Sequence, residues 1–321
     1  VYVVKTDTGA VAGMVNTAGS GNVSGRAISP DGRLVAVTRS DTSAVAGEID
    51  LYTVVDGRKT ASFKPHYDRA TRKTDLVMAR FVAPDKVLTV TSTGGFATWS
   101  VADQTKILTV PGTLKPDTIK QSWASPGPCG FDVSQDGKVL ALFDGRGYTF
   151  YDTATGNPVG KTEPALAEGE YVAGPAALRS DGSQLAALFL VGKAKSPTTL
   201  VVVWDVHTGK KVSEFKPAMD DRPDWASIQW FGPDHVLVRL TGGWSNRVWS
   251  VENPRQVTEI VTLTLPGSPG DKLWIQVAKS HLDKDGPDAP QFLIHAGPPP
   301  LGHHPKLWFT YRGFSSSIPI H

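Results

Sequence analysis

Short apolar runs recur along this chain, and each follows a polar turn. The turns are rich in Asp, Gly and Pro, and they are SPDGR (29–33), APDK (83–86), SQDGK (134–138), SDGSQ (180–184), GPDH (232–235) and SPGDK (268–272). The runs behind them are LVAVT (34–38), VLTVT (87–91), VLALF (139–143), LAALF (185–189), VLVRL (236–240) and LWIQV (273–277). Runs of this length between turn signals are typical of strands that are buried on both faces. No stretch keeps a helical period for more than a turn or two, so the pattern predicts an all-β fold.

A further predicted strand ends in an aromatic residue that recurs every 45 to 53 residues, at Tyr52, Trp99, Tyr151, Trp204 and Trp249. A turn then leads to a fourth strand, as in YDTATGNPV (151–159) and WDVHTGKKV (204–212). A period of this size indicates stacked supersecondary units. Because four strands per unit form one blade, the sequence predicts a β-propeller of four-stranded antiparallel blades.

We place the blades at about 27–76, 77–128, 129–173, 174–226, 227–262 and 263–321, with 1–26 a partial blade, in a single domain over 1–321. Seven blades are favoured, with one blade built from both ends or lacking strands. Six are possible if the two ends pair into one blade. Since the chain opens in the middle of a repeat, we expect it to be a fragment of a longer parent with other domains.

The pairs that end the third strands resemble those of a known family. They are Trp204-Asp205 and the degenerate copies Tyr151-Asp152, Trp99-Ser100 and Trp249-Ser250. Together with the SPDG-type turns, they resemble the WD-repeat β-propellers and their looser bacterial relatives over about residues 27–262. No repeat within residues 27–262 contains the Gly-His dipeptide of that family. The resemblance therefore implies that the buried Asp-His-Ser/Thr-Trp hydrogen-bond network of the family is incomplete in every blade.

The segment GNPVGKT (156–162) looks like a phosphate-binding loop. That loop needs a Gly five residues before the second Gly, and it must open a helix. Thr155 stands where the first Gly is required, and the residues that follow, 163–175, are rich in Pro and Gly. We therefore predict that this segment is a hairpin turn and that Lys161 does not bind phosphate.

Motifs for catalysis and metal binding are missing from the sequence. It has no G-x-S-x-G and no H-E-x-x-H, and the sole cysteine, Cys129, has no nearby His. The acidic stretches HLDKDGPDAP (281–290) and MDDRPDW (219–225) lack the ligand spacing of a calcium loop. The sequence thus predicts no catalytic, metal or cofactor site. An enzyme of the hydrolase or lyase type, with a site at the channel mouth, stays as the alternative.

Composition narrows the class of partner. The 321 residues are 40% hydrophobic and 20% charged with a net charge of +2, which is typical of a globular protein that is not directed to nucleic acid. No apolar run reaches the length of a membrane span. A single cysteine excludes an intrachain disulfide, but it does not decide between a cytoplasmic and an exported location.

Four long loops, each with an aromatic residue, lead from the fourth strand of one blade to the first strand of the next. Such loops share one rim of a propeller, and loops on a rigid scaffold gather binding residues. Loops 64–75 and 113–128 are net positive, whereas 161–173 and 216–226 are net negative. We predict a non-catalytic module for protein or peptide interaction or sensing. Its partner-binding residues on this rim are expected to be His66, Tyr67, Arg69, Trp123, Tyr171, Arg222, Trp225 and Trp244.

Overall fold

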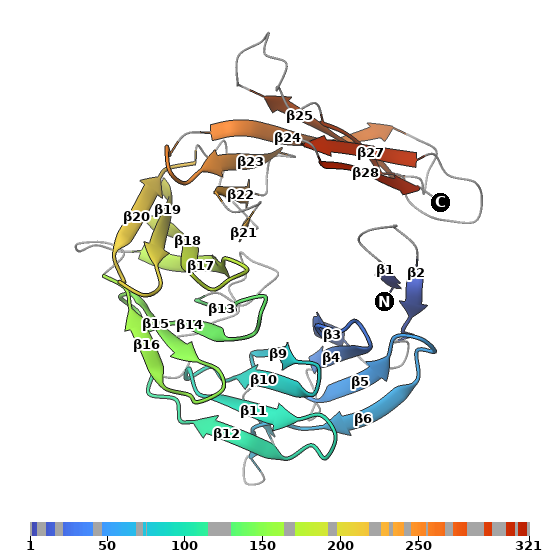
Figure 1. Ribbon diagram of the computed structural model, residues 1–321, viewed down its shortest axis with the longest axis vertical. Helices are drawn as coiled ribbons and strands as arrows, with labels where there is room; N and C mark the ends of the chain where they lie inside the picture. Colours follow the sequence, from blue (N-terminus) through green and yellow to red (C-terminus); the bar gives the residue numbers. More distant parts are fainter. Residues whose placement is uncertain are drawn as a thin grey trace.

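The computed structural model shows β-strands arranged as blades around a common centre (Figure 1). The described residues are 2–4, 11–16, 22–40, 47–68, 73–74, 76–114, 130–163, 171–191, 198–217, 226–230, 234–240, 245–254, 256–266, 272–280, 292–296, 306–311 and 314–319. All regular structure within these ranges is β-strand, and every strand pair is antiparallel. The predicted all-β fold of four-stranded antiparallel units is thereby confirmed.

Four of the units are separate four-stranded sheets in which the first strand is innermost and the fourth outermost (Figure 1). Blade 1 contains β3 (Asn22–Ile28), β4 (Leu34–Ser40), β5 (Ile49–Thr53) and β6 (Lys59–Phe63). Blade 2 contains β9 (Met78–Ala83), β10 (Lys86–Val90), β11 (Phe96–Ser100) and β12 (Lys106–Val110). Blade 3 contains β13 (Phe131–Val133), β14 (Val139–Phe143), β15 (Tyr148–Asp152) and β16 (Pro158–Lys161). Blade 4 contains β17 (Tyr171–Leu178), β18 (Gln184–Val191), β19 (Thr198–Asp205) and β20 (Lys211–Phe215).

Blade 5 begins an eight-stranded sheet. Its own strands are β21 (Ala226–Trp230), β22 (His235–Leu240), β23 (Ser245–Ser250) and β24 (Gln256–Pro266). The sheet continues through β25 (Lys272–Ser280), β26 (Phe292–Ala296), β27 (Lys306–Tyr311) and β28 (Phe314–Pro319). Because β25 pairs with β24, these strands do not form a sheet of their own. The count of seven blades is therefore not confirmed and stays a prediction, as do the domain boundaries.

Two short hairpins complete the described strands. β1 (Tyr2–Val4) pairs with β2 (Val11–Met14) beside blade 1, and β7 (Tyr67–Asp68) pairs with β8 (Lys73–Thr74) between blades 1 and 2. In the described part of the chain, β1 and β2 form a two-stranded sheet, as a partial blade would.

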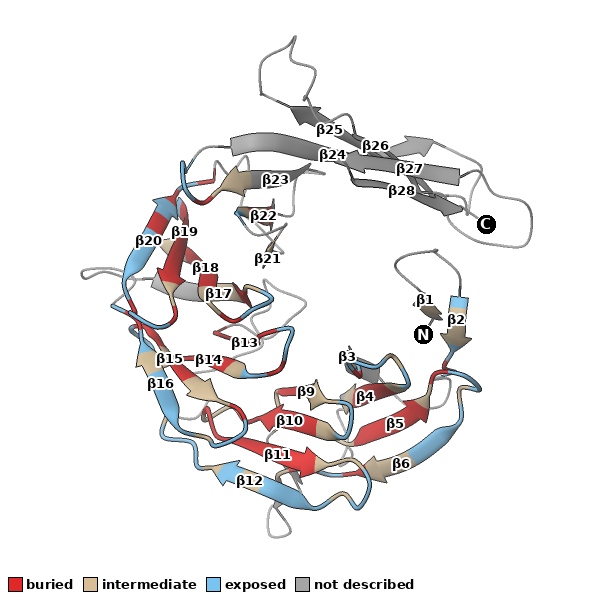
Figure 2. Cartoon of the chain, viewed as in Figure 1, coloured by how far each residue is buried: buried red, intermediate tan, exposed pale blue. Residues whose placement is uncertain are grey.

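The hydrophobic core is divided among the junctions between neighbouring blades. The middle strands of blades 1 to 4 are largely buried, whereas the outermost strands face solvent (Figure 2). Trp204 of β19 is fully buried, and its ring centroid lies 5.9 Å from that of Tyr148 in blade 3. Trp99 lies 5.7 Å from Phe63 of blade 1, in the same arrangement.

The other repeated aromatic residues occupy equivalent junctions. Tyr151 lies 5.3 Å from Phe96 of blade 2, and Trp249 stacks on Phe215 of blade 4 at 4.8 Å. Each of these aromatic residues therefore contacts an aromatic ring of the preceding blade. The repeated aromatic residues thus pack between blades.

The segment that resembles a phosphate loop is a β-hairpin. The Asp152 carboxylate accepts hydrogen bonds from the backbone N–H groups of Ala154 and Thr155 and from the Thr155 hydroxyl. These hydrogen bonds, from Thr155 above all, hold the pKa of Asp152 below its usual value. Lys161 ends strand β16, and its Nζ lies 2.8 Å from an oxygen of Asp144. The hairpin prediction is confirmed.

Candidate functional site

A cavity of about 630 Å³ opens among the innermost strands of blades 2 to 5. Its walls come from β9, β13, β17 and β21 and from the turns that follow β13 and β17. The lining residues are Arg80, Asp132, Gln135, Ala176, Ala177, Leu178, Arg179, Ser180, Asp181, Ile228, Gln229 and Trp230. Since these first strands face the middle of the ring (Figure 1), the cavity belongs to the central channel.

Asp132 connects three of the innermost strands at this cavity. One carboxylate oxygen accepts a hydrogen bond from the backbone N–H of Leu178 at 2.7 Å, and the other lies 3.5 Å from the guanidinium of Arg80. Only 14% of the Asp132 side chain is exposed. Burial raises the pKa of this carboxyl, although the charge of Arg80 and the backbone hydrogen bonds oppose the shift.

Two arginines supply positive charge to the cavity. The Arg80 side chain is 52% exposed, and its guanidinium has five N–H donors. Arg179 lies 3.5 Å from Asp181, whose carboxylate also accepts hydrogen bonds from the N–H and the hydroxyl of Ser183. The two arginines balance the carboxylates of Asp132 and Asp181, so the four groups have no net formal charge.

Trp230 forms the apolar side of the cavity together with Ile228. Its indole N–H donates to the backbone carbonyl of Ala177 at 2.9 Å. This hydrogen bond fixes the ring between blades 4 and 5. The cavity thus combines a half-exposed guanidinium with a fixed aromatic wall.

Neither a family model nor a curated protein matches this chain. Its fold, in contrast, matches 1111 solved chains. One is the crystal structure of the C-terminal WD40 domain of Sif2, with a TM-score of 0.51 and 14% sequence identity over 89% of this chain and 71% of that chain. The chain folds as a WD40-like β-propeller. This confirms the predicted resemblance, and at 14% identity the likeness concerns the fold alone.

Blade 2 contains three of the four residue types of the Asp-His-Ser/Thr-Trp hydrogen-bond network that the WD-repeat resemblance implies, namely His66, Thr89 and Trp99. The Thr89 hydroxyl accepts a hydrogen bond from the indole N–H of Trp99 at 2.8 Å, and it lies 2.7 Å from Nε2 of His66. The same hydroxyl donates to the carbonyl of Ala97 at 3.2 Å. The imidazole also stands edge-on to Trp99.

His66 therefore has a structural role that the sequence analysis missed. A search for Gly-His does not find it, because Pro65 precedes it in the sequence. Its backbone lies in the left-handed region, with φ of 54°. The contacts of His66 with Thr89 and Trp99 are directed into the propeller. That His66 also binds a partner stays a prediction.

In blade 4, the cavity lies at the end of the innermost strand away from the rim predicted to bind a partner. Strand β17 runs from Tyr171 at the loop-bearing rim to Leu178 at the cavity, a separation of about 23 Å at the usual rise per residue. Tyr67 and Tyr171 fall in described strands, β7 and β17. The other predicted anchors lie outside the described residues, and they are Arg69, Trp123, Arg222, Trp225 and Trp244.

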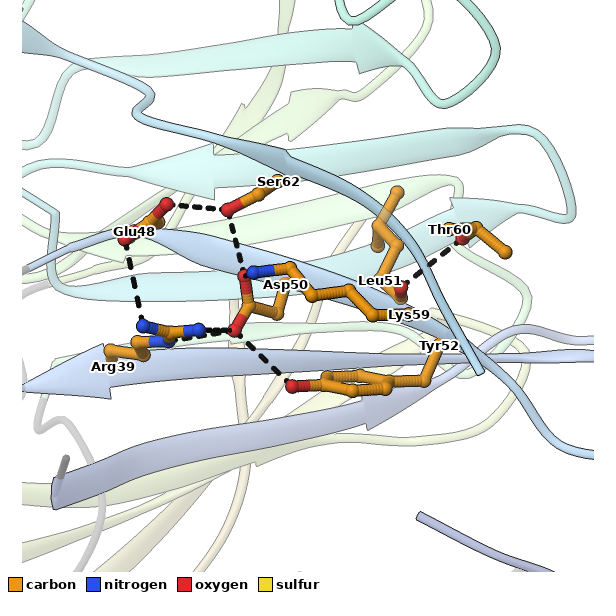
Figure 3. Close-up of polar contacts among 8 residues, drawn as sticks. All are labelled: Arg39, Glu48, Asp50, Leu51, Tyr52, Lys59, Thr60 and Ser62. Carbon is orange, nitrogen blue, oxygen red and sulfur yellow. Dashed lines mark hydrogen bonds and ion pairs between the residues drawn. The ribbon is translucent and has the colours of Figure 1, made fainter. Parts of the chain in front are cut away.

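A second polar cluster lies within blade 1 (Figure 3). The fully buried carboxylate of Asp50 accepts hydrogen bonds from Arg39 Nε at 2.6 Å and from the Ser62 hydroxyl at 2.7 Å. It also forms an ion pair with Lys59 at 2.5 Å. Burial alone would raise the pKa of Asp50, but the hydrogen bonds from Lys59 and its other partners outweigh burial and lower it. Because both oxygens already have partners, this cluster joins β4, β5 and β6 and leaves no acceptor for a ligand.

No group of three or more His, Cys, Asp or Glu side chains that could hold a metal ion occurs within the described ranges. The acidic stretches 219–225 and 281–290 lie outside those ranges. The part of the chain that the structure describes also has no helix long and apolar enough to cross a membrane.

Proposed function

We propose that this propeller is a non-catalytic scaffold that binds a protein or peptide partner through the rim of loops leading into its innermost strands. The observation that supports this is the anchoring of those loops in buried structure. Loop 64–77, for example, leaves β6 at the buried Phe63 and enters β9 at the buried Met78. Loops that are carried on a rigid scaffold in this way are where binding residues gather.

The charges of these loops favour a protein partner over nucleic acid. Loops 64–75 and 113–128 are net positive, and loops 161–173 and 216–226 are net negative. Because successive blades are neighbours in the ring, a basic part of the rim would adjoin an acidic part. Nucleic acid would need one continuous basic track, whereas a partner of mixed charge would be oriented by this division.

One feature favours the alternative of an enzyme at the channel mouth. Asp132 is a carboxyl group in a cavity with a raised pKa, as is common for catalytic acids. Its two oxygens, however, face Leu178 N–H and Arg80, an arrangement that joins neighbouring blades. We therefore favour the scaffold.

A peptide selected against the full chain by phage display would test the proposal. Binding of the labelled peptide would be followed by fluorescence anisotropy. Tyr67→Ala and Trp225→Ala should each weaken binding by more than about 1 kcal/mol, as interface anchors do. Lys210→Ala and Lys211→Ala, at exposed positions on the opposite rim, serve as the matched controls and should leave binding unchanged.

Equal losses from both rims, or no loss from either, would exclude the loop-bearing rim as the site. Circular dichroism of each variant separates a loss of binding from a loss of fold.

A further inference from the structure

The cavity in the channel differs from the proposed rim in position and in chemistry. Its two carboxylates are already engaged: Asp132 faces Leu178 and Arg80, and Asp181 faces Ser183 and Arg179. The guanidinium of Arg80 is engaged only in part. Of the five N–H donors of Arg80, one nitrogen approaches Asp132, at 3.5 Å, which is longer than a good charge-assisted hydrogen bond.

The guanidinium of Arg80, which is half-exposed, therefore has hydrogen-bonding capacity left for a ligand. Arginine presents parallel N–H donors that match a carboxylate or a phosphate in two-point geometry. A cation would instead have to displace Arg80 from Asp132, and it would meet a like charge in the cavity. Both considerations favour an anionic ligand.

We propose that this cavity binds a carboxylate carried by a peptide, with Arg80 as the anion-binding residue and Trp230 as the wall for an adjacent apolar side chain. The volume of about 630 Å³ falls in the range of small-ligand sites, enough for a few residues of a peptide. The lining extends to the β13–β14 and β17–β18 turns, which leaves a chain terminus or a loop an entry beside those turns.

Charge distinguishes a carboxylate from a phosphate as the ligand. The four charged residues of the cavity sum to zero, and the Asp132 carboxylate would lie close to any anion held by Arg80. For a dianionic phosphate both the attraction to Arg80 and the repulsion by Asp132 double. The cost of removing the ligand from water rises with the square of its charge, so it is several times larger for the dianion, and a cavity with no net charge does not offset it. The arrangement thus favours Glu, Asp or a C-terminal carboxylate over a phosphorylated side chain.

The test uses the full chain and a set of acetyl-Leu-X-Leu-amide peptides in which X is Glu, Asp, Gln, Asn or phosphoserine, measured by isothermal titration calorimetry. The Glu or Asp peptide should bind at least about tenfold more tightly than its amide counterpart, as expected when a charge-assisted pair is lost. Arg80→Gln should abolish that preference. Arg58→Gln, on an exposed turn residue of blade 1, is the matched control and should retain it.

Asp132→Asn provides a second, opposite test. Asparagine keeps an oxygen acceptor for the Leu178 N–H but removes the charge that competes for Arg80. The affinity for the Glu peptide should therefore rise by about threefold to tenfold. A merely structural role of Asp132 would not produce a gain.

Several results would overturn the proposal. They are equal binding of acidic and amide peptides, no effect of Arg80→Gln, an equal effect of Arg58→Gln, or tighter binding of phosphoserine than of Glu. If Arg80→Gln fails to fold, Arg80→Lys keeps the charge and loses the two-point geometry, and it should weaken the Glu peptide at least threefold. The variants Tyr67→Ala and Trp225→Ala should not affect this site, so its failure is distinguishable from failure of the rim.

Discussion

The hydroxyl of Thr89 holds the polar network of blade 2 together, and replacing Thr89 by Val removes that hydroxyl with little change of shape. The side chain is fully buried. It receives the indole N–H of Trp99 at 2.8 Å, contacts His66 Nε2 at 2.7 Å and donates to Ala97 at 3.2 Å. A hydroxyl has one donor and two acceptor positions, so all three positions are in use.

The expected loss of unfolding free energy follows from the hydrogen bond that each partner of Thr89 loses. The Trp99 indole is buried, and a buried donor without an acceptor costs about 1–3 kcal/mol. His66 is half-buried, so water replaces part of its lost bond and its share is smaller. The more apolar Val side chain offsets a fraction of the total. We expect Thr89→Val to lower the free energy of unfolding by about 2 kcal/mol.

The assay is urea unfolding followed in parallel by circular dichroism and tryptophan fluorescence, because coincident transitions are needed to interpret a free energy for a repeat fold. Thr89→Ser keeps the hydroxyl and should cost less than about 1 kcal/mol for the lost methyl group. In a Trp99→Phe background the indole N–H is gone, so Thr89→Val should cost at least about 1 kcal/mol less than in the parent. The reasoning is wrong if Thr89→Val lies within about 0.5 kcal/mol of the parent, or if its cost is the same in both backgrounds.

Three further predictions concern other blades. Trp204→Ala should cost about 3–5 kcal/mol, as for other large buried side chains; a melting temperature within a degree or two of the parent would exclude the inter-blade packing. The lowered pKa of Asp50 contributes stability above about pH 4, the unfolded value, and the contribution is lost as pH falls through the lower folded value. The difference in unfolding free energy between the parent and Asp50→Asn should therefore shrink below about pH 4, and a constant difference down to pH 2 would contradict this. Titration with ATP and Mg²⁺ should give no saturable binding, and binding that Lys161→Ala abolishes would refute the hairpin interpretation.

The blade cores were predictable from the sequence because their signal is local and repeated. An aromatic residue such as Trp204 stands next to the end of the third strand in each unit, and it packs at the junction with the preceding strands each time. The turns were predictable for the same reason. Ser134 and Asp136 of SQDGK bond to each other and to the following backbone, as Ser29 and Asp31 of SPDGR do.

The cavity was not predictable in this way, because its members come from different blades. Arg80 and Asp132 are 52 residues apart in the sequence, and each is a single charged residue in an otherwise apolar first strand. Only the closure of blades side by side brings them to 3.5 Å. A charged residue inside the first strand of two consecutive units was the available signal.

The strand register explains why blade 2 has this hydrogen-bond network and blade 4 does not. Thr89 stands two residues after Val87, the partner of Trp99 across the strand pair. Ala187 occupies the corresponding place in blade 4, two residues after Leu185, the partner of Trp204. Within the described residues, the buried indole N–H of Trp204 has no hydrogen-bond partner. Blade 4 thus relies on ring packing where blade 2 also has hydrogen bonds.

The place of the β1–β2 hairpin follows from contacts that the blades repeat. In blade 4, Gly209 in the turn before the fourth strand abuts the carbonyl of Lys161, in the fourth strand of blade 3. In blade 1, Gly57 in the same turn abuts the carbonyl of Met14 in β2. Tyr52 likewise packs against Val15 and its neighbours, as Trp204 packs against blade 3. β2 therefore stands where a fourth strand stands and β1 where a third strand stands. A complete blade at this position needs two inner strands beside β1, and that one blade is built from both ends of the chain or lacks strands stays a prediction.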